Sequence, residues 1–171
     1  PWTYLKFPYY RPTGYPDGIY RVGPLARLNL AERCGTPLGD GELAEYKDLQ
    51  PGPQLASFYY HYARLIEIIY ALERMEQLLS QPDILETHVR AEAGVNALEG
   101  IGVSEAPRGT LIHHYQIDEH GLIRSVNLIV ATTHNVAGIS LSIKEMARAV
   151  VHGGKVDQGI LNLVEMSFRN Y

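Results

Sequence analysis

The stretch that decides the fold is residues 105–115, which read Glu-Ala-Pro-Arg-Gly-Thr-Leu-Ile-His-His-Tyr. Pro107 is rigid and Gly109 is conformationally free, so the backbone is expected to turn tightly here and to hold the Arg108 guanidinium at a fixed place. Glu105 opens the stretch, and a run typical of a strand closes it. The stretch predicts a loop that carries site residues. A structural turn with a surface arginine is the alternative.

The composition is that of an ordinary folded domain. The chain has 171 residues, of which 46% are hydrophobic and 20% charged, with a formal net charge of −4. These values argue against a disordered chain and against a basic surface for nucleic acid or anionic membranes. Charged residues interrupt the long apolar runs, so no membrane span is expected. We predict one domain over residues 1–171, in which the single cysteine, Cys34, excludes a disulfide framework.

Residues 1–56 are predicted to form an extended, loop-rich region that packs aromatic side chains onto another surface. The opening mixes tyrosines with prolines and glycines, which prevents a long helix or strand. Pro24 is expected near the first turn of a short helix, and a short acidic helix is expected near residues 42–47. A nucleic-acid stacking platform is the alternative for the opening, but few cations accompany the rings.

Residues 57–109 are predicted to be a helical region. Apolar side chains recur at three- and four-residue spacing over residues 57–80, which predicts a long amphipathic helix with Ser57 as its N-cap and an end before Pro82. A turn and a weaker helix are expected over residues 82–99. The predicted buried stripe of the long helix comprises Phe58, Tyr62, Leu65, Ile66, Ile69, Leu72 and Leu79.

The hydrophobic period then changes to two, which predicts an antiparallel β-hairpin over residues 110–130. A turn at residues 118–121 would place His113 opposite Val126. Neighbouring residues of a strand point to opposite faces, so His113 and His114 are not expected to bind one metal together. The plainer expectation is one buried, hydrogen-bonded histidine and one that is more exposed.

Residues 131–171 are predicted to be a second helical region. A polar cluster at residues 131–135 ends a strand and starts a helix, where a hydroxyl such as that of Thr132 caps backbone amides or reaches a ligand. One helix is expected over residues 140–151, and a last helix is expected with Asp157 as its cap. The predicted fold class is therefore mainly α with one antiparallel β-hairpin, an α+β fold.

Several separated motifs, taken in order, resemble the large subunit of nickel-iron hydrogenases. Within that family the chain is most similar to the soluble, reversible branch that is NAD-linked or viologen-reducing. The resemblance covers essentially the whole chain and implies the middle portion of the large-subunit fold. The motifs are GIYRVGPLAR at 18–27, YHYARLIEI at 60–68, EAPRG at 105–109 and NLIVATTHN at 127–135.

This resemblance implies a nickel-iron centre with cyanide and carbon monoxide ligands, held in the parent protein by two Cys-x-x-Cys pairs near the ends of its chain. Neither pair occurs in these 171 residues, and the final residues resemble those that precede the C-terminal pair. The chain begins at Pro1 rather than Met and is expected to be an internal segment. We therefore expect no metal ligand in the segment, no metal bound to it and no activity of the segment alone.

The same resemblance implies roles for particular residues. Arg108 is expected to overhang the open side of the metal pair with Pro107 beside it, so both are expected catalytic residues. The Thr132 hydroxyl is expected to hydrogen-bond a cyanide ligand. Glu105 is expected to anchor the loop, and His113 is a further candidate for hydrogen bonding near the centre. Many relatives have Ser at the position of Thr132, and the residues beside it here also differ from the common pattern.

The function implied for the parent protein is reversible heterolytic cleavage of dihydrogen in the cytoplasm. The implied partners are diaphorase subunits that pass electrons to NAD, together with an iron-sulfur small subunit. No nucleic acid and no membrane span are expected. One alternative is the quinone-site subunit of respiratory NADH dehydrogenase, which shares the ancestral fold and a similar loop but lacks the metal. A non-catalytic interaction module is another. Residues 110–115 and the Thr-Thr-His-Asn cluster favour the hydrogenase.

Overall fold

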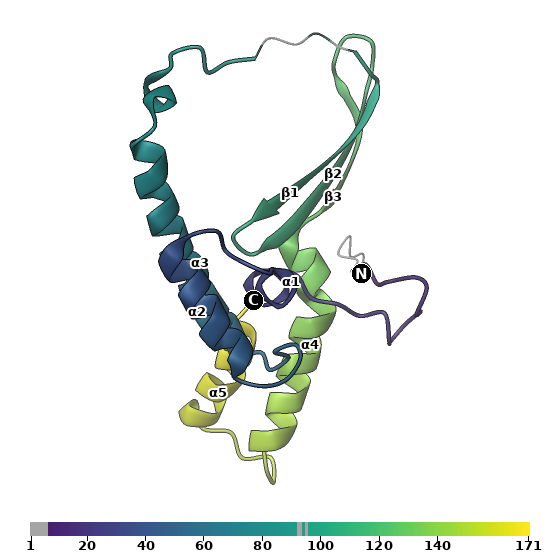
Figure 1. The fold of residues 1–171 in the computed structure, drawn as a ribbon. Coiled ribbons are helices and arrows are strands. Elements are labelled where there is room, and N and C mark those ends of the chain that lie inside the picture. The colour runs from purple at the N-terminus through teal and green to yellow at the C-terminus, as the bar shows by residue number, and fades with distance from the viewer. Residues whose placement is uncertain (1–6, 92–93, 95) are drawn as a thin grey trace.

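The computed structural model describes residues 7–91, 94 and 96–171 (Figure 1). In this part of the chain, five α-helices and a 3-10 helix accompany a three-stranded antiparallel sheet. Part of the predicted extended opening (residues 1–6) and part of the predicted weaker helix (residues 92, 93 and 95) lie outside the described residues. The elements are α1 (Pro24–Leu30), α2 (Pro37–Asp48), α3 (Tyr59–Leu79), η1 (Pro82–Leu85), β1 (Glu99–Ala106), β2 (Gly109–Ile117), β3 (Ile123–Ile129), α4 (Ala131–Val150) and α5 (Gln158–Phe168).

The hydrophobic core lies where α1, α2 and α3 pack together. Pro24 occupies the first turn of α1, as predicted, because its fixed φ suits a helix start. The predicted acidic helix is present as the longer α2. The ring of Tyr46 on α2 packs nearly edge-on against that of Tyr62 on α3, with the ring centroids 5.5 Å apart. The buried side chains of this core are Leu25, Leu28, Leu43, Tyr46, Tyr60, Ala63 and Ile66.

Helix α3 confirms the long helix predicted over residues 57–80, but its start differs. Phe58 is the N-cap residue, and no side chain caps the helix. The prediction of Ser57 as the cap is wrong because its hydroxyl has tertiary partners instead, lying 3.2 Å from the hydroxyl oxygen of Ser142 and 3.3 Å from that of Tyr171. The helix ends ahead of Pro82, as predicted.

The buried stripe predicted for α3 is wrong in part. Ile66 is buried, but Leu65, Leu72 and Leu79 are exposed by 58%, 58% and 72%. Apolar residues occupy more than one face of this helix, and α1 and α2 cover only one face along part of its length. The residues that α3 buries are Tyr60, Ala63 and Ile66.

Residues 99–106 form strand β1, which corrects the prediction of a helical region over 57–109. The weaker helix predicted after residue 82 also fails to form in residues 86–91. β1 pairs with β2 along its whole length. Two glycines disfavour a helix here, and the alternating Ile101 and Val103 suit a strand once β2 lies beside it.

The predicted hairpin is present as β2 and β3, in a different register. His113 lies opposite Leu128 rather than opposite Val126. The turn causes the difference, because Asp118 Oδ1 accepts two backbone amides within it and the register shifts near the end of β2. An even shift leaves His113 on its predicted face. The fold class, mainly α with an antiparallel hairpin, is confirmed, and β1 extends the hairpin into a larger sheet.

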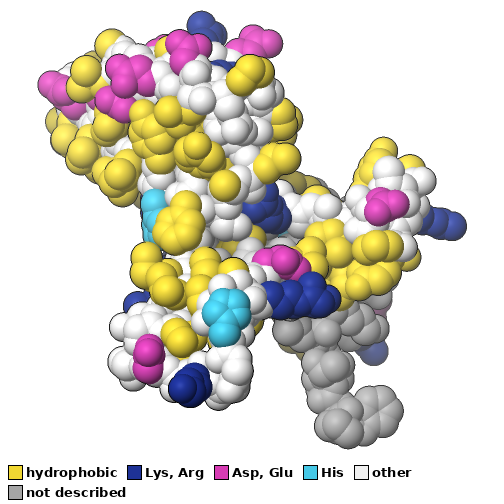
Figure 2. Space-filling view, turned by 90° about the horizontal axis from the view of Figure 1, so that it is seen from below, with side chains coloured by type: hydrophobic (Ala, Val, Ile, Leu, Met, Phe, Trp, Pro, Cys, Tyr) yellow, Lys and Arg dark blue, Asp and Glu magenta, His cyan; other side chains and the backbone are white. Residues whose placement is uncertain are grey.

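Helices α4 and α5 lie beside each other at the end of the molecule opposite the far end of the sheet (Figure 1). α4 begins at Ala131, earlier than the predicted residue 140, because it follows β3 directly. Asp157 caps α5 as predicted, and its carboxylate accepts the Ile160 amide at 2.9 Å. Seen from this end, hydrophobic side chains cover much of the surface (Figure 2). Exposed apolar residues of these helices include Leu141, Leu161, Leu163 and Met166.

The sheet projects from the helices, with the turn between β1 and β2 at its near end (Figure 1). This places residues 106–109 beside α1 and leaves the opposite end of the sheet away from the helices. Within the described residues, no helix has both the length and the apolar character needed to cross a membrane. The near end of the sheet is therefore where the fold brings residues 105–109 into contact with other elements.

Candidate functional site

The turn between β1 and β2 packs its backbone directly against the start of α1. Gly109 and Gly23 have φ angles of 138° and 109°, which residues with a β-carbon rarely adopt. A β-carbon on Gly23 would lie 2.7 Å from the Arg108 carbonyl oxygen, and one on Gly109 would lie 3.0 Å from the Gly23 nitrogen. Both glycines are needed for this approach, which fixes one side of the turn formed by Pro107 and Arg108.

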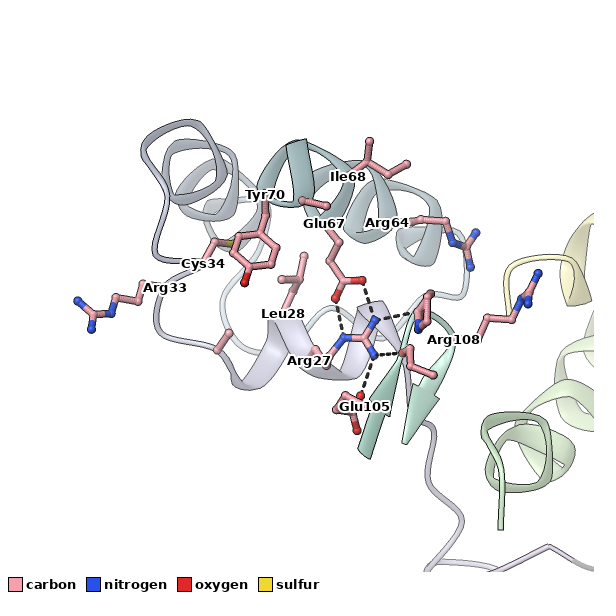
Figure 3. A pocket seen from close by; sticks show the side chains of 14 residues that line it. Arg27, Leu28, Arg33, Cys34, Arg64, Glu67, Ile68, Tyr70, Glu105 and Arg108 are labelled. Atoms are coloured by element: carbon pink, nitrogen blue, oxygen red, sulfur yellow. Dashed lines mark hydrogen bonds and ion pairs between the residues drawn. The ribbon is translucent and has the colours of Figure 1, made fainter. Parts of the chain in front are cut away.

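Arg27 on α1 binds both this turn and α3 (Figure 3). Its Nε and Nη2 donate to the two carboxylate oxygens of Glu67 at 2.6 and 2.7 Å, which is a bidentate pair. Its Nη1 donates to the Ala106 carbonyl at 3.0 Å, and its Nη2 to the Pro107 carbonyl at 2.9 Å. Nη1 also donates to Glu105 Oε2 at 2.8 Å. One guanidinium thus joins the turn to two helices.

The Glu105 carboxylate is held in place by donors on both sides. It accepts hydrogen bonds from Arg27 and from the Thr110 hydroxyl. Partial burial alone would raise the pKa of Glu105, but these hydrogen bonds and the Arg27 charge hold it below its ordinary value. The hydrogen bond to Glu67 is the main cause that raises the pKa of Arg27. Glu105 and Arg27 therefore form a stable ion pair at the turn.

Arg108 lies between two cavities. The larger, of about 780 Å³, is bounded by α1, α3 and the turn, and its lining includes Glu105 and Pro107 (Figure 3). The smaller, of about 230 Å³, lies toward α4 and α5 and is lined by both Arg108 and Thr132. Among the described residues, no hydrogen bond or ion pair engages the Arg108 guanidinium or the Thr132 hydroxyl. Two available donors from separate elements therefore share one cavity.

The polar cluster at residues 131–135 starts α4, as predicted, but it does not cap the helix. Val130 is the N-cap residue, and no side-chain hydrogen bond closes the first turn. Because α4 continues straight from β3, the Thr132 side chain lies inside the first turn and is exposed. Its hydroxyl is therefore available to the smaller cavity rather than used by the helix itself.

The first turns of α4 also hold the segment that precedes α1. Asn135 Oδ1 accepts the Val22 amide at 2.8 Å, and Asn135 Nδ2 donates to the Val22 carbonyl at 3.2 Å. The Tyr60 hydroxyl donates to the same carbonyl at 3.0 Å. Beside them, His134 Nδ1 lies 2.6 Å from the Tyr20 hydroxyl oxygen, and burial lowers the pKa of His134. These contacts support the backbone on which the turn rests.

His113 does not join this group. It lines a separate cavity of about 450 Å³ beside the sheet, where its ring centroid lies 6.1 Å from that of Tyr115. On the opposite face, His114 Nε2 lies 2.6 Å from Glu99 Oε1. The expectation of one buried and one exposed histidine is wrong, because both side chains are partly buried. The structure brings Glu105, Pro107, Arg108 and Thr132 together and leaves His113 apart.

Arg27, Tyr60 and Asn135 had no role predicted from the sequence. Each lies in one of the motifs GIYRVGPLAR, YHYARLIEI and NLIVATTHN, which was the one available signal. Their partners are distant in the chain: Arg27 lies 40 residues from Glu67, and Asn135 lies 113 residues from Val22. Contacts at such separations leave no local pattern that sequence reasoning detects.

The described residues do not fit as ligands of a metal. Among them, no group of three or more His, Cys, Asp or Glu side chains is placed to hold a metal ion. Cys34 lines the larger cavity, but burial raises the pKa of its thiol, which disfavours the thiolate that binds metals. The free donors of Arg108 and Thr132 fit a different role, which is hydrogen bonding to the outer ligands of a centre held by other residues.

A family model described as nickel-dependent hydrogenase matches residues 2–146. The chain belongs to the nickel-dependent hydrogenase family. This hydrogenase chain is 43% identical over 148 residues to a vhu subunit of the F420-non-reducing hydrogenase of Methanococcus voltae, covering 86% of the chain and 35% of that protein. It is 38% identical over 174 residues to NAD-reducing hydrogenase HoxS subunit beta of Cupriavidus necator, covering 99% of the chain and 36% of that protein.

Solved hydrogenase structures share the fold. The chain is similar to a crystal structure of NAD+-reducing [NiFe]-hydrogenase in the H2-reduced state, with a TM-score of 0.90 and 40% identity over 99% of this chain and 38% of that one. It is less similar to the Ni-Fe-Se hydrogenase from D. vulgaris Hildenborough, with a TM-score of 0.52 and 26% identity over 68% of this chain and 26% of that one. The hydrogenase chain spans between 35% and 39% of the length of the curated relatives it matches. Its family favours a hydrogenase over the interaction module and the quinone-site subunit.

Proposed function

We propose that the complete protein is the large subunit of a nickel-iron hydrogenase that cleaves dihydrogen heterolytically and reversibly. Electrons would pass first to an iron-sulfur small subunit, and then through diaphorase subunits to NAD. Family membership and the similarity to an NAD-reducing hydrogenase subunit support this proposal. The single observation that carries it is the cavity that Arg108 and Thr132 line together with their donors free.

The metal centre would be held by residues outside the described part of this chain and would carry cyanide and carbon monoxide ligands. When bound, it supplies the Lewis acid that polarises dihydrogen. The Arg108 guanidinium then contributes a fixed positive charge and planar donors, and the Thr132 hydroxyl contributes one further donor for a cyanide nitrogen. Pro107 restricts the backbone beside Arg108 and so limits where the guanidinium can lie.

Arg108 is proposed to act by stabilising charge rather than by taking up a proton. A guanidinium keeps its proton in proteins and has no acceptor, so it donates hydrogen bonds without first having to lose charge. Donors that are already in place when charge develops stabilise a transition state most effectively. The 171 residues by themselves are proposed to bind neither nickel nor iron and to turn over no hydrogen, because soft thiolate ligands are needed and Cys34 is a lone cysteine. A cytoplasmic location stays a prediction.

The test is Arg108→Lys in the complete enzyme. We expect nickel content near that of the wild type and hydrogen uptake reduced by a factor on the order of 100 to 1,000, the usual cost of removing one preorganised donor. Nickel is measured by elemental analysis on the same preparation that is assayed. Arg148→Lys is the matched control, because Arg148 forms an exposed pair with Glu145 on α4. Unchanged turnover with full nickel would remove Arg108 from the mechanism, and lost nickel would make its role structural.

A further inference from the structure

We propose that Arg27 is a positioning residue for the proposed hydrogenase reaction, acting through Arg108. The guanidinium of Arg27 fixes the backbone of residues 105–109 and thereby sets where the Arg108 side chain begins. This inference rests on the proposed function and extends it to a residue in another element. It is carried by the hydrogen bonds of Arg27 and by the absence, among the described residues, of any bond to the Arg108 guanidinium itself.

The direction of Arg108 depends on its backbone, since no side-chain contact with the described residues holds its guanidinium. The backbone carbonyls just before it, those of Ala106 and Pro107, accept hydrogen bonds from Arg27. On the other side, Gly23 and Gly109 make close backbone contact. The turn is therefore held between Arg27 on one side and a glycine contact on the other. Without Arg27, only the glycine contact and the strand pairing would constrain it.

Arg27 is itself held by a rigid partner. Its bidentate pair with Glu67 is short, with the two side chains only 26% and 22% exposed, and Glu67 stands on the long helix α3. The pair leaves Nη1 and Nη2 with further protons directed at the turn and at Glu105. A lysine has one nitrogen and cannot make this planar set of contacts, although it keeps the charge near Glu67.

The competing view is that Arg27 only stabilises the packing of α1 on α3. The two views differ in what happens when Arg108 is already changed. If Arg27 works through Arg108, its loss has little left to affect in an Arg108→Lys background, so the two losses are not additive. If Arg27 only stabilises the fold, its effect is the same in either background. A double-mutant cycle therefore separates the roles.

The experiment uses the complete enzyme with Arg27→Lys, Arg108→Lys and the double variant. For Arg27→Lys we expect kcat to fall between about 10-fold and 100-fold, with KM for dihydrogen changed less than about 2-fold, because a small misplacement of a positioned group lowers the rate of the chemical step. In the Arg108→Lys background, Arg27→Lys should cost less than about 3-fold more. Full additivity, or unchanged kcat in the single variant, overturns the proposal.

Hydrogen exchange supplies a measurement that does not depend on turnover. In the complete protein carrying Arg27→Lys, peptides that contain residues 105–109 should exchange faster, while peptides from α1 and α3 exchange as in the wild type. Faster exchange in those helices as well would make Arg27 a structural residue and overturn the proposal. Arg148→Lys should change neither region. If the wild-type protein had no hydrogenase activity, the proposed function would fail, yet the exchange result would still decide whether Arg27 fixes the turn.

A second variant covers the case in which Arg27→Lys does not yield folded protein. Glu67→Gln keeps the size of the side chain on α3 and weakens the bidentate pair that orients Arg27. It should shift kcat and the exchange of residues 105–109 in the same direction by smaller factors. A Glu67→Gln enzyme with wild-type kcat and wild-type exchange at the turn contradicts the positioning role.

Discussion

The two ends of the β1–β2 hairpin differ in what holds them. At the near end, the backbone of residues 106–109 contacts Gly23 and accepts hydrogen bonds from Arg27. At the far end, Glu99 bonds to His114 and Gln116 within the sheet itself. Strand pairing is similar along the hairpin. Pairing therefore makes the hairpin, but side chains and backbone from outside the sheet fix where Arg108 lies.

The strongest way to break this comparison is to add a methyl group at each end. Gly109→Ala should weaken the near end by about 3 kcal/mol, because it combines a strained positive φ with a backbone clash. Gly102→Ala is the matched control at the outer part of β1, since nothing lies within 4 Å of its added β-carbon. Hydrogen exchange of residues 20–24 and 105–111 in the complete protein measures both. Equal effects of the two variants would show that the near end is no more constrained.

A smaller effect is expected from the asparagine that supports the near end from below. Asn135→Ala removes both hydrogen bonds to Val22 and leaves buried backbone groups without a partner, which should cost about 2 kcal/mol. Asn127→Ala, at an exposed position of β3, should change stability by less than about 0.5 kcal/mol. The midpoint of thermal unfolding of the complete protein compares the two. A similar loss at both sites would contradict a special role for Asn135.

The smallest expected effect is a dependence on pH at the same support. Burial lowers the folded-state pKa of His134, so below its ordinary value of 6.5 the unfolded chain binds the proton more readily than the folded chain. Stability should therefore fall as the pH drops through the range below about 6.5 and stay flat above it. His134→Gln should flatten this part of the profile, as measured by urea unfolding at a series of pH values. A variant profile as steep as that of the wild type would exclude His134 as the source.

Local patterns were enough to predict the elements but not the contacts between them. The spacing of apolar residues located α3, and Asp157 marked the start of α5, because both signals depend on neighbours within a few residues. The start of α3 was misjudged because Ser57 has partners far away in the chain, Ser142 and Tyr171. Strand β1 was missed because its conformation depends on pairing with β2 rather than on its own glycine-rich sequence.

The candidate site was predicted in a similar, partial way. Residues 105–109 and Thr132 were found from motifs, and the structure brings Arg108 and Thr132 to one cavity. His113 was placed near them only by its position next to the turn, and the strand carries it away into another cavity. Arg27 was quoted within a motif without a role, since nothing local indicates that a helix residue bonds to a turn 79 residues further on.

The contacts of Arg27 have a consequence for the order of folding. Its partners lie 40 residues away in Glu67 and 78 to 80 residues away in the turn. Closing loops of that length costs chain entropy before any contact compensates, whereas the helices and the hairpin form from local contacts. The turn should therefore be fixed only after α1 has docked on α3. A nascent chain can carry all of its secondary structure while the guanidinium of Arg108 still has no settled direction.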